Sequence, residues 1–320
     1  MAEVVYRPAE LDDAALAADL MTASYPALAQ DPVITRYRWS QPRRDYDYGR
    51  FIGEQNGRPM AYVAWIHGPW EKLPDRHCEV ELWLDREVLD HELLKTLWSW
   101  IGDQAESEGS GQLLAYAAED EHEMLEALVT LGYERDRVEK VWELDLRTHG
   151  AGLVAQSKDA RDRMAGGGIR FGTVAESRDP ALLQKLHALT NVTIQDVPHT
   201  LPILDETYED FERRMNAPDR RRDRFWIAYD SDRPVALSYL KFPPVRGTAW
   251  TGYTCSDPEY RGRGLARGVK LQSLAQAVEL GVPLVCTDND AENAPMLHIN
   301  ETLGYRRRPG FVSHLKRVSK

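Results

Sequence analysis

The pattern of hydrophobic and polar positions along this 320-residue chain repeats once. Residues 4–7 (VVYR), followed by a polar stretch and a helical stretch rich in alanine and leucine, resemble residues 169–172 (IRFG) and their sequel. Each pattern predicts a first strand that leads into a first helix. Residues 57–63 and 232–238 are similar in the same way, since a polar turn separates two stretches rich in aromatic and β-branched residues, which predicts a β-hairpin in each half.

A third similarity lies near the end of each half. One helical pattern contains Met124 and Leu128 and ends in Leu-Gly-Tyr at 131–133, and another contains Met296 and Ile299 and ends in Leu-Gly-Tyr at 303–305. A glycine ends each helix, and an aromatic residue opens the next strand. Each half therefore predicts strand, helix, hairpin, strand, helix, strand, helix, strand. This order is typical of an α/β (α+β) fold, in which helices flank a mixed, mostly antiparallel sheet with one parallel crossover.

The two halves are joined by residues 148–168, which include the glycine-rich strings HGAG and AGGG. Such a composition resists regular structure and predicts a linker. We therefore expect an N-terminal domain at 1–147 and a C-terminal domain at 169–320. The length of the chain agrees, because it is enough for two hydrophobic cores of ordinary size.

Composition narrows the class of protein. Hydrophobic residues make up 42% of the chain, and no run of about eighteen apolar residues predicts a membrane span. The first residues show no secretory signal, so we expect a cytoplasmic protein. The three cysteines and nine histidines have neither disulfide nor metal-ligand spacing, so no metal site is expected and the cysteines should be buried in strands. The net charge of −11 disfavours nucleic acid as a partner.

The most informative segment is 251–266 (TGYTCSDPEYRGRGLA). A strand pattern is broken by Asp-Pro, and a tight Arg-Gly-Arg-Gly turn then leads into a helical pattern. Glycines at such a turn allow backbone amides to approach a ligand, and the start of the helix adds partial positive charge. Arg261 and Arg263 add cations. The segment predicts a site for a pyrophosphate.

Residues 261–266 (RGRGLA) resemble the Gln/Arg-x-x-Gly-x-Gly/Ala motif of the GNAT family of N-acetyltransferases, in which this turn holds the pyrophosphate of coenzyme A. The second half of the family pattern follows as a strand at 282–287, Asp-Asn, and the helix that ends in Leu-Gly-Tyr. The resemblance implies two tandem GNAT folds, and a slot for acetyl-CoA between two diverging strands. It places these residues at the cofactor: Tyr253, Thr254, Cys255, Arg261, Gly262, Arg263, Gly264, Leu265, Ala266, Asn289 and Asn293.

The family transfers the acetyl group directly, so an amine attacks the thioester while a backbone amide of the strand around Tyr253 stabilises the oxyanion. Many members carry a tyrosine as general acid where this chain has Asn300, and asparagine cannot donate a proton as an acid. Either Tyr253 or a water supplies the proton, or Asn300 positions the thiol by a hydrogen bond. For the general base the sequence leaves four candidates, which are Asp257, Asp288, Glu292 and His298.

The N-terminal half lacks these features. Its equivalent turn, 85–92 (DREVLDHE), contains no glycine, and Glu121 stands where the other half has Asn293. We interpret it as a degenerate copy that supports the sheet or shapes the acceptor site. This arrangement resembles tandem acetyltransferases of the mycothiol synthase type.

The acceptor is expected to be a small-molecule amine, in a protein that is a monomer or homodimer. In the family the segment after the first helix often forms one wall of the acceptor site. Here it is 191–208, with acidic residues that suit a cationic amine. The residues of interest in it are Asp196, His199, Asp205 and Glu206. The alternative function is a non-catalytic acyl-CoA sensor, which the missing tyrosine at position 300 would favour.

Overall fold

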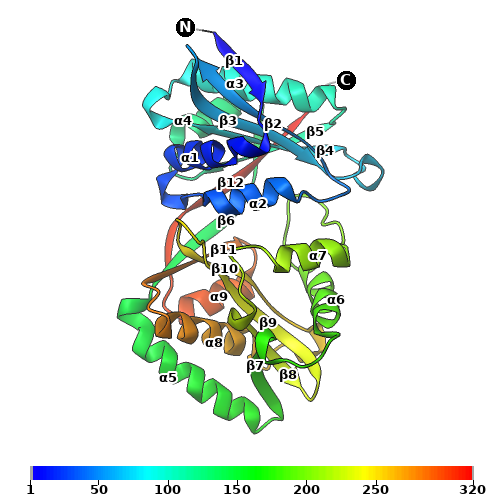
Figure 1. Cartoon of the computed structure of the whole chain (residues 1–320), viewed down its shortest axis with the longest axis vertical. Helices are drawn as coiled ribbons and strands as arrows, with labels where there is room; N and C mark the ends of the chain where they lie inside the picture. The colour runs from blue at the N-terminus through cyan, green and yellow to red at the C-terminus, as the bar shows by residue number, and fades with distance from the viewer. Residues whose placement is uncertain (1–2, 319–320) are drawn as a thin grey trace.

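The computed structural model describes residues 3–318 and contains one sheet of twelve strands (Figure 1). The strands are β1 Val4–Pro8, β2 Asp47–Gln55, β3 Arg58–His67, β4 His77–Leu84, β5 Gln112–Ala118, β6 Glu134–Asp145, β7 Ile169–Thr173, β8 Phe225–Asp230, β9 Arg233–Lys241, β10 Ala249–Ser256, β11 Leu284–Asp290 and β12 Arg306–Arg317. The α-helices are α1 Ala14–Ser24, α2 Pro32–Ser40, α3 His91–Ser107, α4 His122–Thr130, α5 Leu146–Ala165, α6 Leu182–Ile194, α7 Tyr208–Met215, α8 Leu265–Glu279 and α9 Ala294–Thr302.

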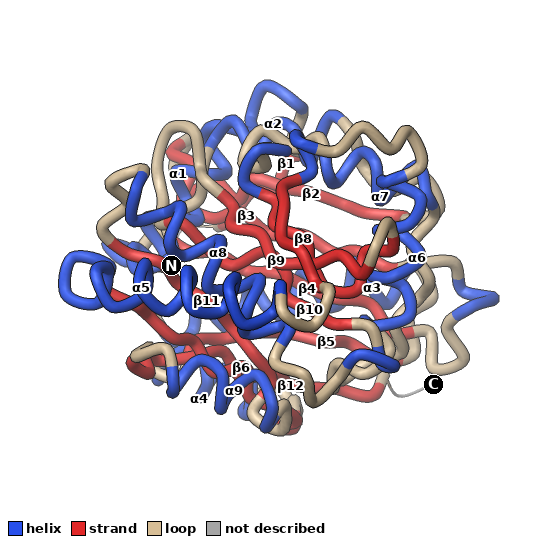
Figure 2. The backbone as a smooth tube through the Cα atoms, turned by 90° about the horizontal axis from the view of Figure 1, so that it is seen from below, coloured by secondary structure: helices blue, strands red, loops and turns tan. Residues whose placement is uncertain are grey.

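The predicted repeat is confirmed. Strands β1 and β7 open the two halves, and β2–β3 and β8–β9 are the two hairpins. Only β4–β5 and β10–β11 pair in parallel among the described residues, so the sheet is mixed and mostly antiparallel, as expected. Helices surround the strands (Figure 2). None of the described helices is long and apolar enough to cross a membrane.

The halves exchange their last strands, which the sequence did not predict. The strand order runs β5-β12-β6-β11, so β12 of the second half pairs with β5, and β6 of the first half pairs with β11. In Figure 1, β12 rises into the N-terminal half while β6 descends into the C-terminal half. Each half therefore supplies a strand to the other, and the two halves together form one continuous sheet.

The expectation of an irregular linker at 148–168 is wrong for most of that segment. Residues 148–165 belong to α5, and only 166–168 form a turn. The glycines are tolerated because α5 lies against α8, where a Cβ on Gly150 would stand only 3.0 Å from Val278 Cγ1. Leu153 and Ala160 are buried along the same face. Tertiary packing thus overrides the low helix propensity of glycine.

Three main hydrophobic clusters hold the sheet and its helices. One fills the N-terminal half around Leu94 and Trp98, and another fills the C-terminal half around Phe211 and Leu237. The third joins α5 and α8 to the exchanged strand β6 through Trp142. The three cysteines are buried in strands and free of disulfides, as expected.

We predict that Leu153→Ala lowers the free energy of unfolding by about 2–4 kcal/mol, because it leaves a cavity between α5 and α8. Lys158→Ala, on the exposed side of the same helix, is the control and should change this free energy by less than about 0.5 kcal/mol. Chemical denaturation followed by circular dichroism measures both. Equal effects of the two substitutions would show that α5 does not pack as described.

Candidate active site

Strands β10 and β11 diverge soon after they begin. They pair in parallel only at Ala249–Val285 and Trp250–Cys286, and the register of β10 against β9 then shifts between Thr251 and Tyr253. The residue at the shift is Gly252, whose place a side chain could not fill, because an added Cβ would lie 1.9 Å from the ring of Tyr239. The divergence that the sequence predicted is therefore present, and it is fixed by close packing of Tyr239 against bare backbone.

The glycine turn has the expected geometry. Gly262 and Gly264 have φ values of 74° and 77°, a left-handed conformation that favours glycine. Gly264 directly precedes α8 and offers no side chain to cap it. The first amides of α8 are thus free of a side-chain acceptor, and the partial positive charge of the helix N-terminus faces the turn. This arrangement suits an anionic group such as a phosphate.

A cavity of about 560 Å³ lies between the turn and the two helices α8 and α9, and we call it the α8–α9 cavity. Nine of the eleven predicted cofactor residues line it: Tyr253, Thr254, Cys255, Arg261, Gly262, Gly264, Leu265, Ala266 and Asn293. The other two do not. Arg263 lies over the ring of Tyr260, and Asn289 accepts a hydrogen bond from Asn300.

The sequence missed the wall of this cavity that comes from the end of α6 and the following loop. Thr193, Asp196 and Val197 all line it. Asp196 forms an ion pair with Arg261, so this loop is held against the glycine turn. Part of the segment expected at the acceptor, 191–208, therefore faces the α8–α9 cavity instead.

Tyr253 lines the α8–α9 cavity. Its hydroxyl lies 3.1 Å from the hydroxyl of Thr193. Burial raises the pKa of Tyr253 above its usual range, so the phenol keeps its proton at neutral pH. Asn293, by contrast, has a structural role already, since its side chain caps α9 at the amide of Met296.

Asn300, expected to position a thiol, lies elsewhere. It is fully buried and does not line the α8–α9 cavity. Its oxygen accepts a hydrogen bond of 2.7 Å from Lys270 Nζ, and its nitrogen donates one of 2.6 Å to Asn289 Oδ1. Burial lowers the pKa of Lys270 to about 7. Because its amide already serves this buried network, Asn300 does not fit the expected role.

A second cavity, of about 310 Å³, lies where β10 and β11 begin to diverge, and we call it the β11 cavity. Asp288 lines it and accepts a hydrogen bond of 2.5 Å from Trp250 Nε1. Glu139 lines it from the exchanged strand β6, and Lys241 from β9. Burial, with the nearby charge of Asp288, raises the pKa of Glu139 to about 7. Burial also lowers the pKa of Lys241 to about 8.

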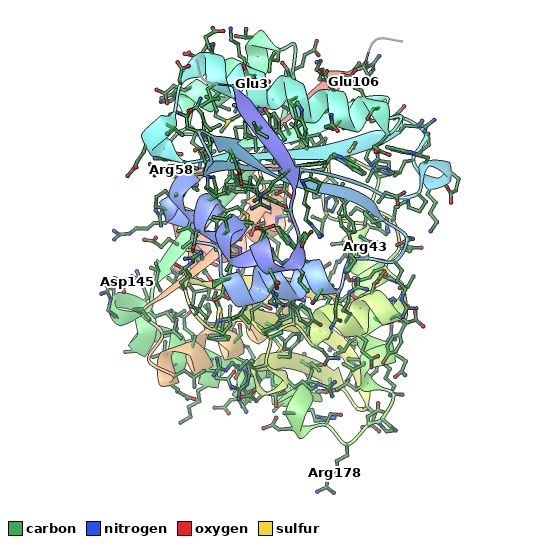
Figure 3. The ribbon with its side chains drawn as sticks, turned by 45° about the horizontal axis from the view of Figure 1, so that its top comes forward. Glu3, Arg43, Arg58, Glu106, Asp145 and Arg178 are labelled. Atoms are coloured by element: carbon green, nitrogen blue, oxygen red, sulfur yellow. The ribbon has the colours of Figure 1, made fainter. Side chains whose placement is uncertain are left out.

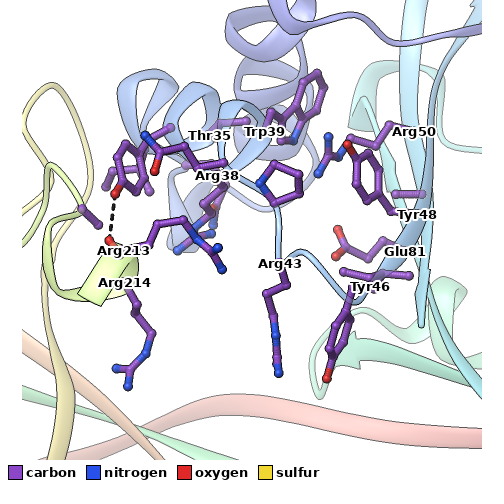
Figure 4. A pocket seen from close by; sticks show the side chains of 18 of the residues that line it. Thr35, Arg38, Trp39, Arg43, Tyr46, Tyr48, Arg50, Glu81, Arg213 and Arg214 are labelled. Carbon is purple, nitrogen blue, oxygen red and sulfur yellow. Dashed lines mark hydrogen bonds between the residues drawn. The ribbon is translucent and has the colours of Figure 1, made fainter. Parts of the chain in front are cut away.

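A third cavity, of about 500 Å³, lies between α2 of the N-terminal half and α7 of the C-terminal half, and we call it the α2–α7 cavity (Figure 4). Six arginines and four acidic side chains line it, together with Trp39, Tyr46 and Tyr48. Arg43 lies at the junction of the halves, whereas Arg178 projects from the far end of the molecule (Figure 3). Arg38 and Asp219 line both this cavity and the β11 cavity, so the two adjoin.

The structure separates the four candidates for the general base. Asp257 forms an ion pair with Arg233, and Glu292 forms one with Arg137. His298 lines the α8–α9 cavity but is exposed. Only Asp288 lines the β11 cavity. Glu139 escaped the sequence analysis because it lies in the other half, and only the strand exchange brings it here.

The equivalent position in the N-terminal half is closed by its own side chains. Arg86, which follows β4, forms an ion pair of 3.3 Å with Glu121 at the start of α4. Asp85 and Asp90 accept hydrogen bonds from the amides of Glu87 and Leu93, so carboxylates already occupy the amides at this turn. These contacts agree with the interpretation of this half as a degenerate copy.

The other residues of interest in 191–208 do not lie together. Glu206 lines the α2–α7 cavity and accepts two hydrogen bonds from Arg214. Asp205 accepts one from Gln195. His199 lies near Asp290, and burial lowers its pKa. Among residues 3–318, no group of three or more His, Cys, Asp or Glu side chains could hold a metal ion.

Comparison with known proteins shows which sequences and structures this chain resembles. Residues 188–305 match the family model "Acetyltransferase (GNAT) family". A tandem GNAT protein from the clavulanic acid biosynthesis pathway has a similar structure, with a TM-score of 0.77 and 17% identity over 99% of both chains. A GCN5-related N-acetyltransferase from Sphaerobacter thermophilus has a TM-score of 0.68 and 16% identity, over 99% of this chain and 96% of that one. No curated protein sequence matches significantly.

These solved structures support the tandem GNAT fold along the whole chain. At such low identities they show the fold alone. The narrower resemblance to tandem acetyltransferases of the mycothiol synthase type stays a prediction.

We predict that Asn300→Ala lowers the free energy of unfolding by about 1–3 kcal/mol, because Lys270 loses its buried acceptor. The double variant Lys270→Met/Asn300→Leu removes both partners and should recover most of this loss. Thermal and chemical denaturation measure the effect. If Asn300→Ala leaves stability unchanged but reduces affinity for acetyl-CoA, the residue serves the ligand and our structural interpretation fails.

Proposed function

We propose that the protein is an acetyl-CoA-dependent N-acyltransferase, because residues 188–305 match the acetyltransferase (GNAT) family model and the whole chain has the tandem GNAT fold. It transfers an acetyl group from coenzyme A to the primary amine of a small molecule by direct attack. We further propose that it acts in the cytoplasm. The observation that carries the proposal is the pair of left-handed glycines before α8, beside two diverging strands.

The α8–α9 cavity fits acetyl-CoA. Gly262 has nothing within 4 Å of the place of a Cβ, and Gly264 has only the methyl group of Met164, at 3.5 Å. Phosphate oxygens can therefore approach the turn, where Arg261 supplies a cation. Beyond Trp250 and Cys286 the facing edges of β10 and β11 are not paired with each other, which leaves room for a pantetheine arm and leaves amides of β10 to stabilise an oxyanion. When bound, acetyl-CoA supplies the thioester.

The reaction requires two proton transfers besides the exchange of bonds. The amine nitrogen forms a bond to the acetyl carbon while the bond from carbon to sulfur breaks. An ammonium gives up one proton before the attack, and its nitrogen loses a second as the amide forms. The departing thiolate takes up one proton, and the other is released to solution. The overall reaction therefore releases one proton for each amide formed. The protein therefore needs a base on the acceptor side and a donor near the sulfur.

Glu139 and Asp288 are the bases that the geometry supports best. Both line the β11 cavity, which begins where the strands diverge. No hydrogen bond or ion pair engages the Glu139 carboxylate within residues 3–318, so it is free to accept a proton from an amine. Its raised pKa of about 7 matches a base that works near neutral pH. The remaining proton donor is Tyr253, which lies in the α8–α9 cavity and stays protonated.

The test of cofactor binding is Gly264→Asp, which should weaken acetyl-CoA binding at least about tenfold, since a carboxylate and a strained backbone would replace the phosphate site. Gly281→Asp is a matched control, because Gly281 ends the same helix with a φ of 74° and open space around it. Calorimetry should give one site per chain for the parent. Two equivalent sites, or equal affinities for the two variants, would contradict the proposal.

For catalysis we predict that kcat/KM rises as the pH increases through about 7, because ionised Glu139 accepts the proton. Glu139→Gln should lower kcat/KM on the order of a hundredfold and remove this limb of the pH profile. The free energy of unfolding should not fall in Glu139→Gln, because burial of the ionised carboxylate opposes folding of the parent. Glu143→Gln, on the same strand but ion-paired with Arg308, is the control. An unchanged profile in Glu139→Gln would exclude Glu139 as the base.

A further inference from the structure

The two cavities on the acceptor side differ in charge. The β11 cavity has four acidic and two basic side chains, whereas the α2–α7 cavity has six arginines and four acidic side chains. Arg38 and Asp219 are shared by both. Asp31, which caps α2, and Asp219 lie on the side of Arg38, and backbone amides already engage Asp31. Glu139 and Asp288 come from β6 and β11. A ligand in the β11 cavity therefore meets carboxylates from β6 and β11 and cations from α2 and β9.

Most cations of the α2–α7 cavity already have partners. Arg213 forms an ion pair with Asp210, and Arg214 forms one with Glu206. Arg50 lies over the rings of Trp39 and Tyr48. These side chains build the walls of the cavity and do not require a ligand.

Arg38 and Lys241 are different. Neither side chain forms a hydrogen bond or an ion pair within the part of the chain that the structure describes, and both line the β11 cavity. They are close enough that the charge of Arg38 helps to lower the pKa of Lys241. Arg220 adds a third positive charge nearby. Asp219 lies near both Arg38 and Lys241, and Asp288 also lies near Lys241. An additional anion would relieve this repulsion.

Glu139 and Asp288 line the same cavity, and no basic side chain is bound to either of them in residues 3–318. Burial and repulsion by Asp288 oppose the ionised form of Glu139, and a cationic group would favour it. A single small ligand with one positive and one negative group would satisfy both the unpaired carboxylates and the unpaired cations. The cavity volume of about 310 Å³ suits a molecule of amino-acid size.

We propose that the acceptor is an amine that also carries a carboxylate, with its amine before Asp288 and Glu139 and its carboxylate bound by Arg38 and Lys241. The planar guanidinium of Arg38 can bind a carboxylate with two hydrogen bonds. A longer acceptor would extend past Arg38 between the aromatic side chains of the α2–α7 cavity. This inference rests on the proposed N-acyltransferase activity and adds the chemical class of its substrate.

The experiment measures release of free thiol from acetyl-CoA with α- and ω-amino acids, each beside its carboxamide, which keeps the amine and removes the negative charge. We expect kcat/KM to be at least about tenfold higher for the best amino acid than for its carboxamide. Arg38→Gln should raise KM for the amino acid about tenfold or more and leave the carboxamide unchanged. Arg36→Gln, on the same helix but outside the lining of both cavities, should affect neither.

A binding measurement makes the result independent of turnover. The same amino acids should raise the melting temperature of the coenzyme A complex of the parent and not of Arg38→Gln. Equal rates for acids and carboxamides, together with no stabilisation that depends on Arg38, would overturn the carboxylate site while leaving N-acyl transfer in place. A preference for aminophosphonates over amino acids would overturn it as well. Failure of acetyl-CoA to bind the parent would instead refute the proposed function.

Discussion

The pairing of β6 with β11 is the interaction on which the candidate active site depends. Strand β11 diverges from β10 on one side, so β6 on its other side supplies the hydrogen bonds that hold it along its length. An unpaired β11 would be an open edge strand with exposed amides and carbonyls. The strand that prevents this comes from the N-terminal half, and it also brings Glu139 to the same cavity as Asp288. The N-terminal half is therefore structurally part of the candidate site.

The divergence of β10 and β11 has a cost, since backbone groups that face the gap lack sheet partners. Contacts on the sides of the strands away from the gap hold each strand in place and offset this cost. Tyr239 packs on Gly252 of β10, while the buried chain from Lys270 through Asn300 to Asn289 ties β11 to α8 and α9. The same unpaired groups are then available to a ligand. A site that must present free amides is in this way kept rigid by interactions outside it.

Much of the fold could be predicted because its signals are local in sequence. The strands, hairpins, helix-ending glycines and the Arg-Gly-Arg-Gly turn each depend on neighbouring residues, and so do nine of the cofactor-cavity residues. What the sequence missed depends on long-range packing. Helix α5 forms despite its glycines because α8 covers it, and Glu139 reaches the site through a strand exchange. Asn300 matched a family position, yet a buried lysine thirty residues away had already engaged it.

Electrostatics shows the same limit. An acidic loop suggested a cationic amine as the acceptor, and a net charge of −11 disfavoured nucleic acid as a partner. Net charge sums the whole surface, however, and salt screens charges more than about 10 Å apart, so it says little about the field inside a cavity. In the β11 cavity the side chain of Lys241 is half-buried and has no ion-pair partner among the described residues, so its charge is screened less than a surface charge. The field that an acceptor meets there therefore depends on the local arrangement of charges and not on their sum over the surface.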